Sequence, residues 1–208
     1  MAGITRKRLE AVCIGTVLVL AAFLRLWRLE ANGFGTEYYA AGVRSALQGG
    51  ALLFYNSFDP AGFLSLDKPP VAFWIQAAFA KVLGFSGWTI HLPQALAGVA
   101  SVALLYRLVR RPFGIAAATI AALLLALTPI AVAIDRSNNT DSWLVFFLLL
   151  FFANKYRHGS SADRSGTTKK TWRFEVAWTA ATLLIFVGLA VWGADIYLHL
   201  YNPPPGAL

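Results

Sequence analysis

Charged residues are scarce in this sequence. Asp, Glu, Lys and Arg make up 13% of its 208 residues, whereas hydrophobic residues make up 58%. A soluble globular domain carries roughly a quarter charged residues, which help to cover its core. The shortage excludes an ordinary water-soluble domain and predicts that the long apolar runs lie in a lipid bilayer.

Cysteine and histidine are also rare, and their scarcity limits the chemistry. Cys13 is the single cysteine, so no intramolecular disulfide can form, and its apolar surroundings indicate a small buried side chain. The three histidines are far apart, and no pair has the spacing of a helix-borne zinc site. The sequence also lacks a convincing glycine-rich phosphate loop and a Ser-His-Asp order. We therefore predict no metal site and no soluble nucleotide-sugar-binding domain.

The apolar runs predict an all-α integral membrane protein with about five transmembrane helices. These spans cover approximately residues 9–27, 85–106, 115–134, 142–154 and 174–197. Because a helix needs roughly 20 residues to cross the hydrocarbon core, the first, second and fourth spans must use flanking residues or neighbouring protein. A signal peptide is the alternative for the first span. Arg25 and Arg28 stand where a small-residue cleavage site would be, which favours a retained anchor.

The net charge of +8 is explained by membrane topology rather than by nucleic-acid binding. Most of the 18 basic residues form short clusters that share one side when the N-terminus is placed in the cytoplasm. The acidic residues of the opposite side are Glu30, Glu37, Asp59, Asp67, Asp135, Asp141 and Asp195. We therefore predict a multi-pass protein with a cytoplasmic N-terminus and acidic external loops.

The first external segment, residues 30–84, is long, and we expect it to bear interfacial helices. One helix begins near Glu37 and continues through Leu47, and a glycine- and aromatic-rich turn follows over residues 48–58. The stretch 71–83 is amphipathic, begins after two prolines that suit a first helical turn, and is predicted to lie along the membrane.

A short polar hairpin, residues 135–141, joins the third and fourth spans on the same side. Carboxylates gathered there could act as general bases or hold a divalent cation, and Lys68 and Arg136 could neutralise a phosphate. The alternative is that these exposed charges are solvated and have no function. The hairpin also contains Asn138-Asn139-Thr140, which matches the pattern of a glycosylation acceptor.

Four motifs resemble those of the bacterial GT-C membrane glycosyltransferases, relatives of the protein mannosyltransferases and the lipid A aminoarabinose transferases. They are Glu37-Tyr38-Tyr39-Ala40-Ala41, Ser57-Phe58-Asp59-Pro60, Asp67-Lys68-Pro69-Pro70 with Trp74, and Arg136-Ser137-Asn138-Asn139-Thr140-Asp141. The resemblance covers about residues 24–150. It implies an enzyme of the bacterial cytoplasmic membrane that moves a sugar from a polyprenyl-phosphate carrier to an extracytoplasmic acceptor with inversion.

The resemblance also implies which residues are catalytic. We predict Glu37 as the base that activates the acceptor, and Asp67 as the group that orients Lys68 or holds a cation. Many of these enzymes carry an Asp-Glu pair where this chain has Thr36-Glu37. Because a hydroxyl cannot replace a carboxylate as a base near neutral pH, Asp59 and Asp67 remain alternatives to Glu37.

The predicted substrate-binding residues are Asp59, Lys68, Arg136 and Asp141. Arg136 and Asp141 are assigned to the carrier phosphate or to a metal bound to it, so a divalent cation is an open alternative. The expected partners are membrane lipid, the lipid-linked sugar donor and an external acceptor.

From about residue 151 the sequence resembles a different family, subunit II of the haem-copper (cytochrome c) oxidases. The carrying pieces are Lys155-Tyr156-Arg157, Trp172-Arg173-Phe174-Glu175-Val176-Ala177-Trp178-Thr179, and Trp192-Gly193-Ala194 through Pro203-Pro204-Pro205. In that family the membrane hairpin leads to an external copper domain, whose Cys and His ligands are not among these residues, so we expect no copper centre here. We predict the N-terminal part of a glycosyltransferase domain over residues 1–150, a cytoplasmic loop over 151–173 and a terminal transmembrane helix over 174–208.

Three hypotheses follow from these two resemblances. The chain is a membrane glycosyltransferase or an incomplete fragment of one, a non-catalytic subunit related to oxidase subunit II, or a membrane scaffold. Small residues in the second span, such as Ala97, Gly98 and Ser101, would serve helix association in a scaffold. A truncated or artificially joined reading frame explains the change of resemblance better than a purposeful fusion.

Overall fold

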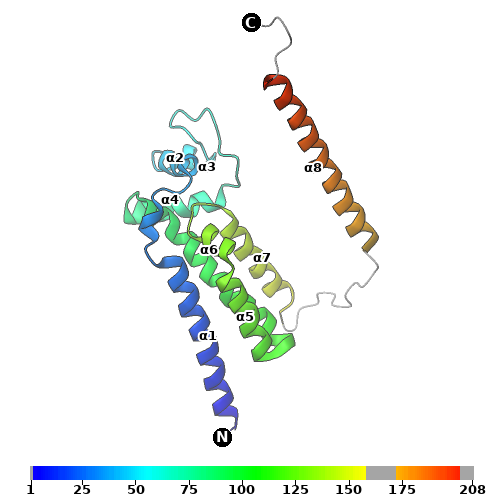
Figure 1. Ribbon diagram of the computed structural model, residues 1–208. Helices are drawn as coiled ribbons and strands as arrows, with labels where there is room; N and C mark the ends of the chain where they lie inside the picture. The colour runs from blue at the N-terminus through cyan, green and yellow to red at the C-terminus, as the bar shows by residue number, and fades with distance from the viewer. Residues whose placement is uncertain (1, 158–171, 202–208) are drawn as a thin grey trace, which may run out of the picture. The chain divides into compact units, whose positions relative to one another are not determined.

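The computed structural model describes residues 2–157 and 172–201 (Figure 1). The chain forms two compact units, Met1–Ser160 and Ser161–Leu208. Within the described ranges the secondary structure is helical and contains no β-strand, apart from an isolated bridge between Ser57 and Ser65. The predicted all-α architecture is therefore confirmed.

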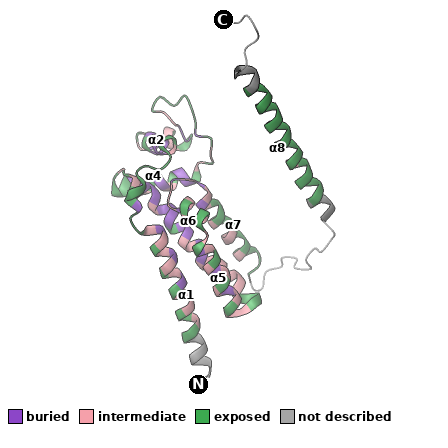
Figure 2. Ribbon diagram, viewed as in Figure 1, coloured by how far each residue is buried: buried purple, intermediate pink, exposed green. Residues whose placement is uncertain are grey.

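In the first unit, the long helix α5 (Gly87–Leu127) is the centre of the packing. It contacts α1 (Ala2–Leu26), α6 (Pro129–Asp135) and α7 (Asp141–Lys155) (Figure 1). Figure 2 shows buried stretches on both α1 and α5, and the buried Val17 and Ala21 of α1 share an apolar cluster with Val102 and Tyr106 of α5.

Helix α5 folds back on itself at Gly114, where the backbone leaves the helical region (φ 85°, ψ −176°). Val102 from its first half and Ala126 from its second half share a buried cluster with Val17 of α1. In a straight helix rising 1.5 Å per residue, Val102 and Ala126 would be about 36 Å apart. Glycine suits the turn because it adopts a positive φ without a Cβ penalty.

The two halves of α5 correspond to the second and third predicted spans, with two differences. The first half continues beyond Tyr106 to the break at Gly114, so the basic stretch 107–111 is helical rather than a loop. The third span is interrupted at Thr128, whose ψ of 114° is not helical, and the chain resumes as α6 at Pro129. Proline causes this break because it has no N–H to donate and restricts the residue before it.

Three described segments are long and apolar enough to cross a membrane: Arg8–Leu26, Gly87–Leu127 and Val176–Tyr197. They confirm the predicted membrane character of the fold. The fourth predicted span is the 15-residue helix α7, which is shorter than these three. The number of five spans therefore stays a prediction.

The long loop between α1 and α5 folds into four short helical elements. They are η1 (Leu29–Asn32), α2 (Glu37–Ala46), α3 (Gly50–Phe54) and α4 (Val71–Leu83). Helices α2 and α4 were predicted, whereas α3 lies where the sequence indicated a turn. Their shared apolar core is Ala40, Val43, Ala46, Leu66, Phe73, Ala77, Ala80 and Ile90. Helix α4 also packs on α5, which fixes the loop at one end of the bundle (Figure 1).

The second unit contains α8 (Trp172–Tyr201). Its described side chains, Val176–Tyr197, are exposed except for the half-buried Thr182 (Figure 2). The fifth predicted span lies within this helix.

Candidate functional site

Asn138 joins the polar hairpin to the long loop. Its side chain is fully buried, and its Oδ1 accepts a hydrogen bond from the Thr36 N–H at 2.9 Å. Its Nδ2 donates to the carbonyls of Phe34 (3.1 Å) and Thr36 (2.9 Å). The backbone carbonyl of Asn138 accepts from Gln76 Nε2 of α4 at 3.2 Å. These bonds hold the start of α2, the middle of α4 and the hairpin together. The burial also keeps a glycosylation enzyme away from Asn138.

Gly35 makes this close approach feasible. Its φ is +65°, and a Cβ there would lie 2.8 Å from His91 Nε2 and 2.9 Å from Asn138 Oδ1. Any other residue would therefore be strained and would push the loop away from the hairpin.

The Asp67-Lys68 segment is held by Asn56, which has a left-handed backbone (φ 54°). Asn56 Nδ2 donates to the Lys68 carbonyl at 3.1 Å, and the Asn56 carbonyl accepts from the Leu66 N–H at 2.8 Å. Asp67 remains exposed and Lys68 is half-buried. The backbone of the segment is thus fixed, and both charged side chains are accessible.

Tyr39 of α2 is influenced by the charges of three of the predicted site residues. Burial raises the pKa of Tyr39, the charges of Asp67 and Asp141 raise it further, and the charge of Lys68 lowers it. A charge influences a pKa in this way only over a short range, because solvent and salt screen it. The charges of Asp67, Lys68 and Asp141 therefore all act on Tyr39, although the three residues come from the long loop and from the start of α7. We call these four residues the Tyr39 cluster.

Glu37 is the first residue of α2 and is exposed. Within the described ranges the Glu37 side chain makes no hydrogen bond or ion pair. Its charge is not among the main influences on the Tyr39 pKa. It is adjacent to Thr36, which Asn138 holds. The structure thus places Glu37 at the same end of the bundle as the Tyr39 cluster, with a free carboxylate.

Asp59 stabilises its own loop. Its Oδ1 accepts from the Ala61 N–H at 2.9 Å, and its Oδ2 accepts from the Leu64 N–H at 3.0 Å. These backbone hydrogen bonds, that of Leu64 first, hold the pKa of Asp59 below its ordinary value. Both carboxylate oxygens are engaged, and the predicted role of Asp59 in substrate binding stays a prediction.

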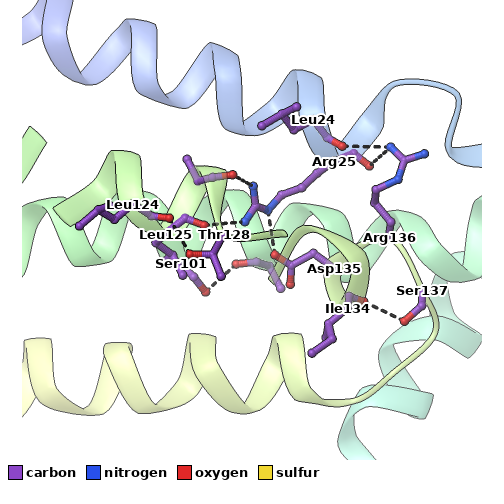
Figure 3. Close-up of polar contacts among 12 residues, drawn as sticks. Leu24, Arg25, Ser101, Leu124, Leu125, Thr128, Ile134, Asp135, Arg136 and Ser137 are labelled. Atoms are coloured by element: carbon purple, nitrogen blue, oxygen red, sulfur yellow. Dashed lines mark hydrogen bonds and ion pairs between the residues drawn. The ribbon is translucent and has the colours of Figure 1, made fainter. Parts of the chain in front are cut away.

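Arg136 caps the end of α1. Its Nη1 donates to the carbonyls of Leu24 (3.0 Å) and Trp27 (2.8 Å), and its Nη2 donates to that of Arg28 (3.3 Å). Figure 3 shows the guanidinium beside the last turn of α1. A basic group suits this position because the last carbonyls of a helix lack partners. Arg136 also lines an open groove of about 600 Å³ with Asn32 and other residues.

Sequence reasoning missed the ion pair between Arg25 and Asp135. Arg25 is completely buried, and its Nε donates to Asp135 Oδ2 at 2.8 Å (Figure 3). Its terminal nitrogens donate to the carbonyls of Ala126 (3.1 Å) and Leu125 (3.3 Å). Gly98 provides the space, since a Cβ there would collide with the Asp135 carboxylate. The sequence offered two signals of this pair: Arg25 lies inside one apolar run, and Asp135 directly follows another apolar run.

A cavity of about 170 Å³ lies beside this ion pair, between α5, α6 and α7. Arg25, Asp135, Asp141 and Ser142 contribute polar groups, and the rest of the lining is mostly apolar. Asp141 both lines this cavity and contributes to the raised pKa of Tyr39.

No three His, Cys, Asp or Glu side chains gather into a metal-binding group in the described part of the chain. The divalent cation considered from the sequence therefore has no ready-made set of ligands among residues 8–157 and 176–197. Its involvement stays a hypothesis.

Comparison with known proteins bears directly on this site. Residues 67–158 match the family described as dolichyl-phosphate-mannose-protein mannosyltransferase, and this range includes Asp67, Lys68, Arg136 and Asp141. The chain is 53% identical over 144 residues to "Putative mannosyltransferase YycA" of Bacillus subtilis (strain 168), which covers 69% of the chain and 21% of that protein. It is 47% identical over 145 residues to "Putative mannosyltransferase YkcB" of the same organism, with 70% and 20% covered. The chain spans about one fifth of the length of these relatives. No solved structure matches it.

These matches give no support to the resemblance between the C-terminal part and oxidase subunit II, which stays a prediction. They do confirm the other resemblance, because the matched range contains two of the four motifs on which it was based. The chain is thus similar, over residues 67–158 and in its apolar helices, to the GT-C type membrane glycosyltransferases of the protein-mannosyltransferase kind.

Proposed function

We propose that this chain forms the donor-binding part of a membrane glycosyltransferase that moves a sugar from a polyprenyl-phosphate carrier to an extracytoplasmic acceptor. The Tyr39 cluster is the observation that carries the proposal. It combines a cation, two carboxylates and a phenol at one end of a bundle of apolar helices. The names of the relatives support sugar transfer, and the apolar helices support a membrane-bound donor.

The reaction needs a base and a cation at one place. The acceptor oxygen attacks the anomeric carbon, the bond between this carbon and the phosphate oxygen breaks, and the carrier phosphate leaves with the bonding electrons. We assign the acceptor's proton to Glu37, whose carboxylate is free, and the charge of the departing phosphate to Lys68. Asp67 orients Lys68 from the neighbouring position.

The carrier also needs room for its apolar chain. The cavity between α5, α6 and α7 is mostly apolar and borders Asp141, which supports a role in receiving the first prenyl units. On this proposal the acidic loops face outward from the bacterial cytoplasmic membrane and the N-terminus is cytoplasmic. The basic residues that precede the fold of α5 at Gly114, and those at the end of α7, lie at the end of the bundle away from the acidic loops, which supports this orientation.

The test is a transfer assay on the full chain in membranes, with radiolabelled polyprenyl-phosphate mannose as donor. Loss of a catalytic base lowers rates by about 10²–10⁴-fold, so Glu37→Gln is expected to lower transfer at least a hundredfold. Asp67→Asn and Asp141→Asn are expected to weaken donor retention, which native mass spectrometry measures separately. Glu30→Gln is the matched control, because Glu30 is an exposed external acid outside the Tyr39 cluster.

Two results would separate the function from the residue assignment. A chain that neither transfers mannose nor retains its carrier in preference to phosphatidylglycerol overturns the proposed function. Transfer that survives Glu37→Gln, Asp67→Asn and Asp141→Asn unchanged overturns the assignment of these residues alone.

A further inference from the structure

The other end of the bundle carries a second pocket, of about 390 Å³, between the first half of α5 and α7. The first half of α5 and helix α7 both begin near the acidic loops and run away from them (Figure 1). The pocket lies along the last turns of α7 and of this half of α5. It is therefore separate from the Tyr39 cluster and plays no part in the proposed transfer reaction.

One wall of the pocket is a stripe on α5 formed by Leu104, Arg107, Leu108 and Arg111. Their spacing of three and four residues places them on one face of the helix. Leu104 begins the stripe, Arg107 and Leu108 follow at about the same level, and Arg111 ends it, so the wall becomes more basic toward the break at Gly114.

The opposite wall repeats this order on α7. Leu150 and Ala153 come first, followed by Asn154 and Arg157. Because both helices run in the same direction, the apolar parts of the two walls lie at one level and the polar parts at the next. The pocket is thus apolar toward the middle of the bundle and carries three guanidinium groups and no carboxylate toward its end.

The neighbouring Arg110 shows that the guanidinium groups of α5 have different environments. Arg110 donates from Nε and Nη2 to the two oxygens of Glu10, at 2.6 Å and 2.8 Å. Arg107 and Arg111 are exposed and make no ion pair or hydrogen bond within the described ranges. Their charge is consequently available to an external anion.

We propose that this pocket binds an anionic glycerophospholipid of the adjacent leaflet. The phosphodiester lies at the guanidinium groups, which suit phosphate oxygens because of their forked donors, and an acyl chain lies along the leucines. Basic pockets between transmembrane helices bind anionic headgroups in this way. A soluble anion would leave the apolar half of the pocket without a role, and a neutral lipid would leave the guanidinium groups without one.

The experiment is native mass spectrometry of the full chain in detergent with phosphatidylglycerol or phosphatidylcholine of matched acyl chains. Wild-type protein is expected to retain phosphatidylglycerol selectively. Because each basic residue near an anionic membrane contributes about 1 kcal/mol, the double variant Arg107→Gln/Arg111→Gln is expected to bind about thirtyfold more weakly. Arg107→Lys/Arg111→Lys keeps both charges and is expected to stay within about threefold of wild type, which excludes misfolding as the cause.

Arg8→Gln is the matched control, since Arg8 is an exposed cation of α1 near the Glu10–Arg110 pair and does not line the pocket. It is expected to change retention less than twofold. Three results would overturn the proposal: equal retention of the two lipids, equal loss in Arg8→Gln and in the double variant, or displacement of phosphatidylglycerol by equimolar inorganic phosphate. The last result would identify a soluble-anion site instead.

Discussion

Two ion pairs connect α1 to α5 and α6, one at each end of the bundle, and they differ in burial. Arg25 and Asp135 meet at 2.8 Å near the acidic loops, with 0% and 9% of their side chains exposed. Arg110 and Glu10 meet at 2.6 Å at the opposite end, with 29% and 28% exposed. Both contacts join an arginine to a carboxylate, so their surroundings decide how much each contributes to the free energy of unfolding.

The buried pair is part of a larger polar network. Arg25 also bonds two carbonyls of α5, and Arg136, which follows Asp135, caps α1. Removing one member of a buried pair leaves an uncompensated charge, whereas in an exposed pair water solvates the charge that remains. The end that bears the candidate site is therefore expected to be the more rigid of the two, and the basic end the more adaptable.

The largest expected effect comes from Asp135→Ala. It leaves the buried Arg25 guanidinium without its carboxylate, so the free energy of unfolding is expected to fall by about 3–5 kcal/mol. Denaturant titration in detergent measures it, with the thiol reactivity of Cys13 as the probe, because this single cysteine lies half-buried in α1. The double variant Arg25→Met/Asp135→Leu removes both charges and is expected to recover most of the loss. A loss no greater than that of Glu10→Gln would remove the contrast between the two ends.

Asn138→Ala tests the hydrogen bonds at the buried end. It removes three side-chain hydrogen bonds to the backbone of Phe34 and Thr36, each worth about 1 kcal/mol, which is expected to cost about 2–3 kcal/mol. Hydrogen exchange of residues 34–40 is expected to quicken as α2 loses its anchor. The matched control is Asn139→Ala, whose side chain accepts one hydrogen bond, from the Asp141 N–H at 3.1 Å. Equal exchange in the two variants would contradict this role of Asn138.

Gly98→Ala disturbs the buried pair without removing a charge. The added methyl group would collide with the Asp135 carboxylate, and overpacking of this kind costs about 1–3 kcal/mol. Gly15→Ala in α1 is the control, since no atom lies within 4 Å of the added Cβ. It is expected to leave stability unchanged or raise it by about 0.5–1 kcal/mol, because alanine favours a helix over glycine. The same denaturant titration compares both variants.

Features that are local in the chain could be predicted from the sequence. Helix α4 has the predicted bounds because two prolines precede it and Gly84, with a φ of 86°, ends it. The turn of α5 at Gly114 falls within the predicted connection between the second and third spans, but the second span was ended several residues too early, because basic residues mark the membrane boundary while the helix continues to Gly114. Helix α3 was missed since five residues are too few to show a helical period.

The site was less predictable because its contacts join distant parts of the chain. Motif resemblance singled out Asp67, Lys68 and Asp141, whose charges all act on the pKa of Tyr39. It gave Tyr39 no role, because a tyrosine in an apolar helix looks like packing. Arg25 and Asp135 are 110 residues apart, and no local pattern pairs them.

The smallest effect is expected from Glu10→Gln at the basic end. The pair is more than a quarter exposed on both sides, and exposed ion pairs contribute about 0–1 kcal/mol, so stability is expected to fall by less than about 1 kcal/mol. The variant also frees Arg110, which does not line the lipid pocket. Phosphatidylglycerol retention is therefore expected to stay equal while stability falls slightly. If the stability of Glu10→Gln fell as far as that of Asp135→Ala, the two ends would be equally rigid, and burial would not distinguish them.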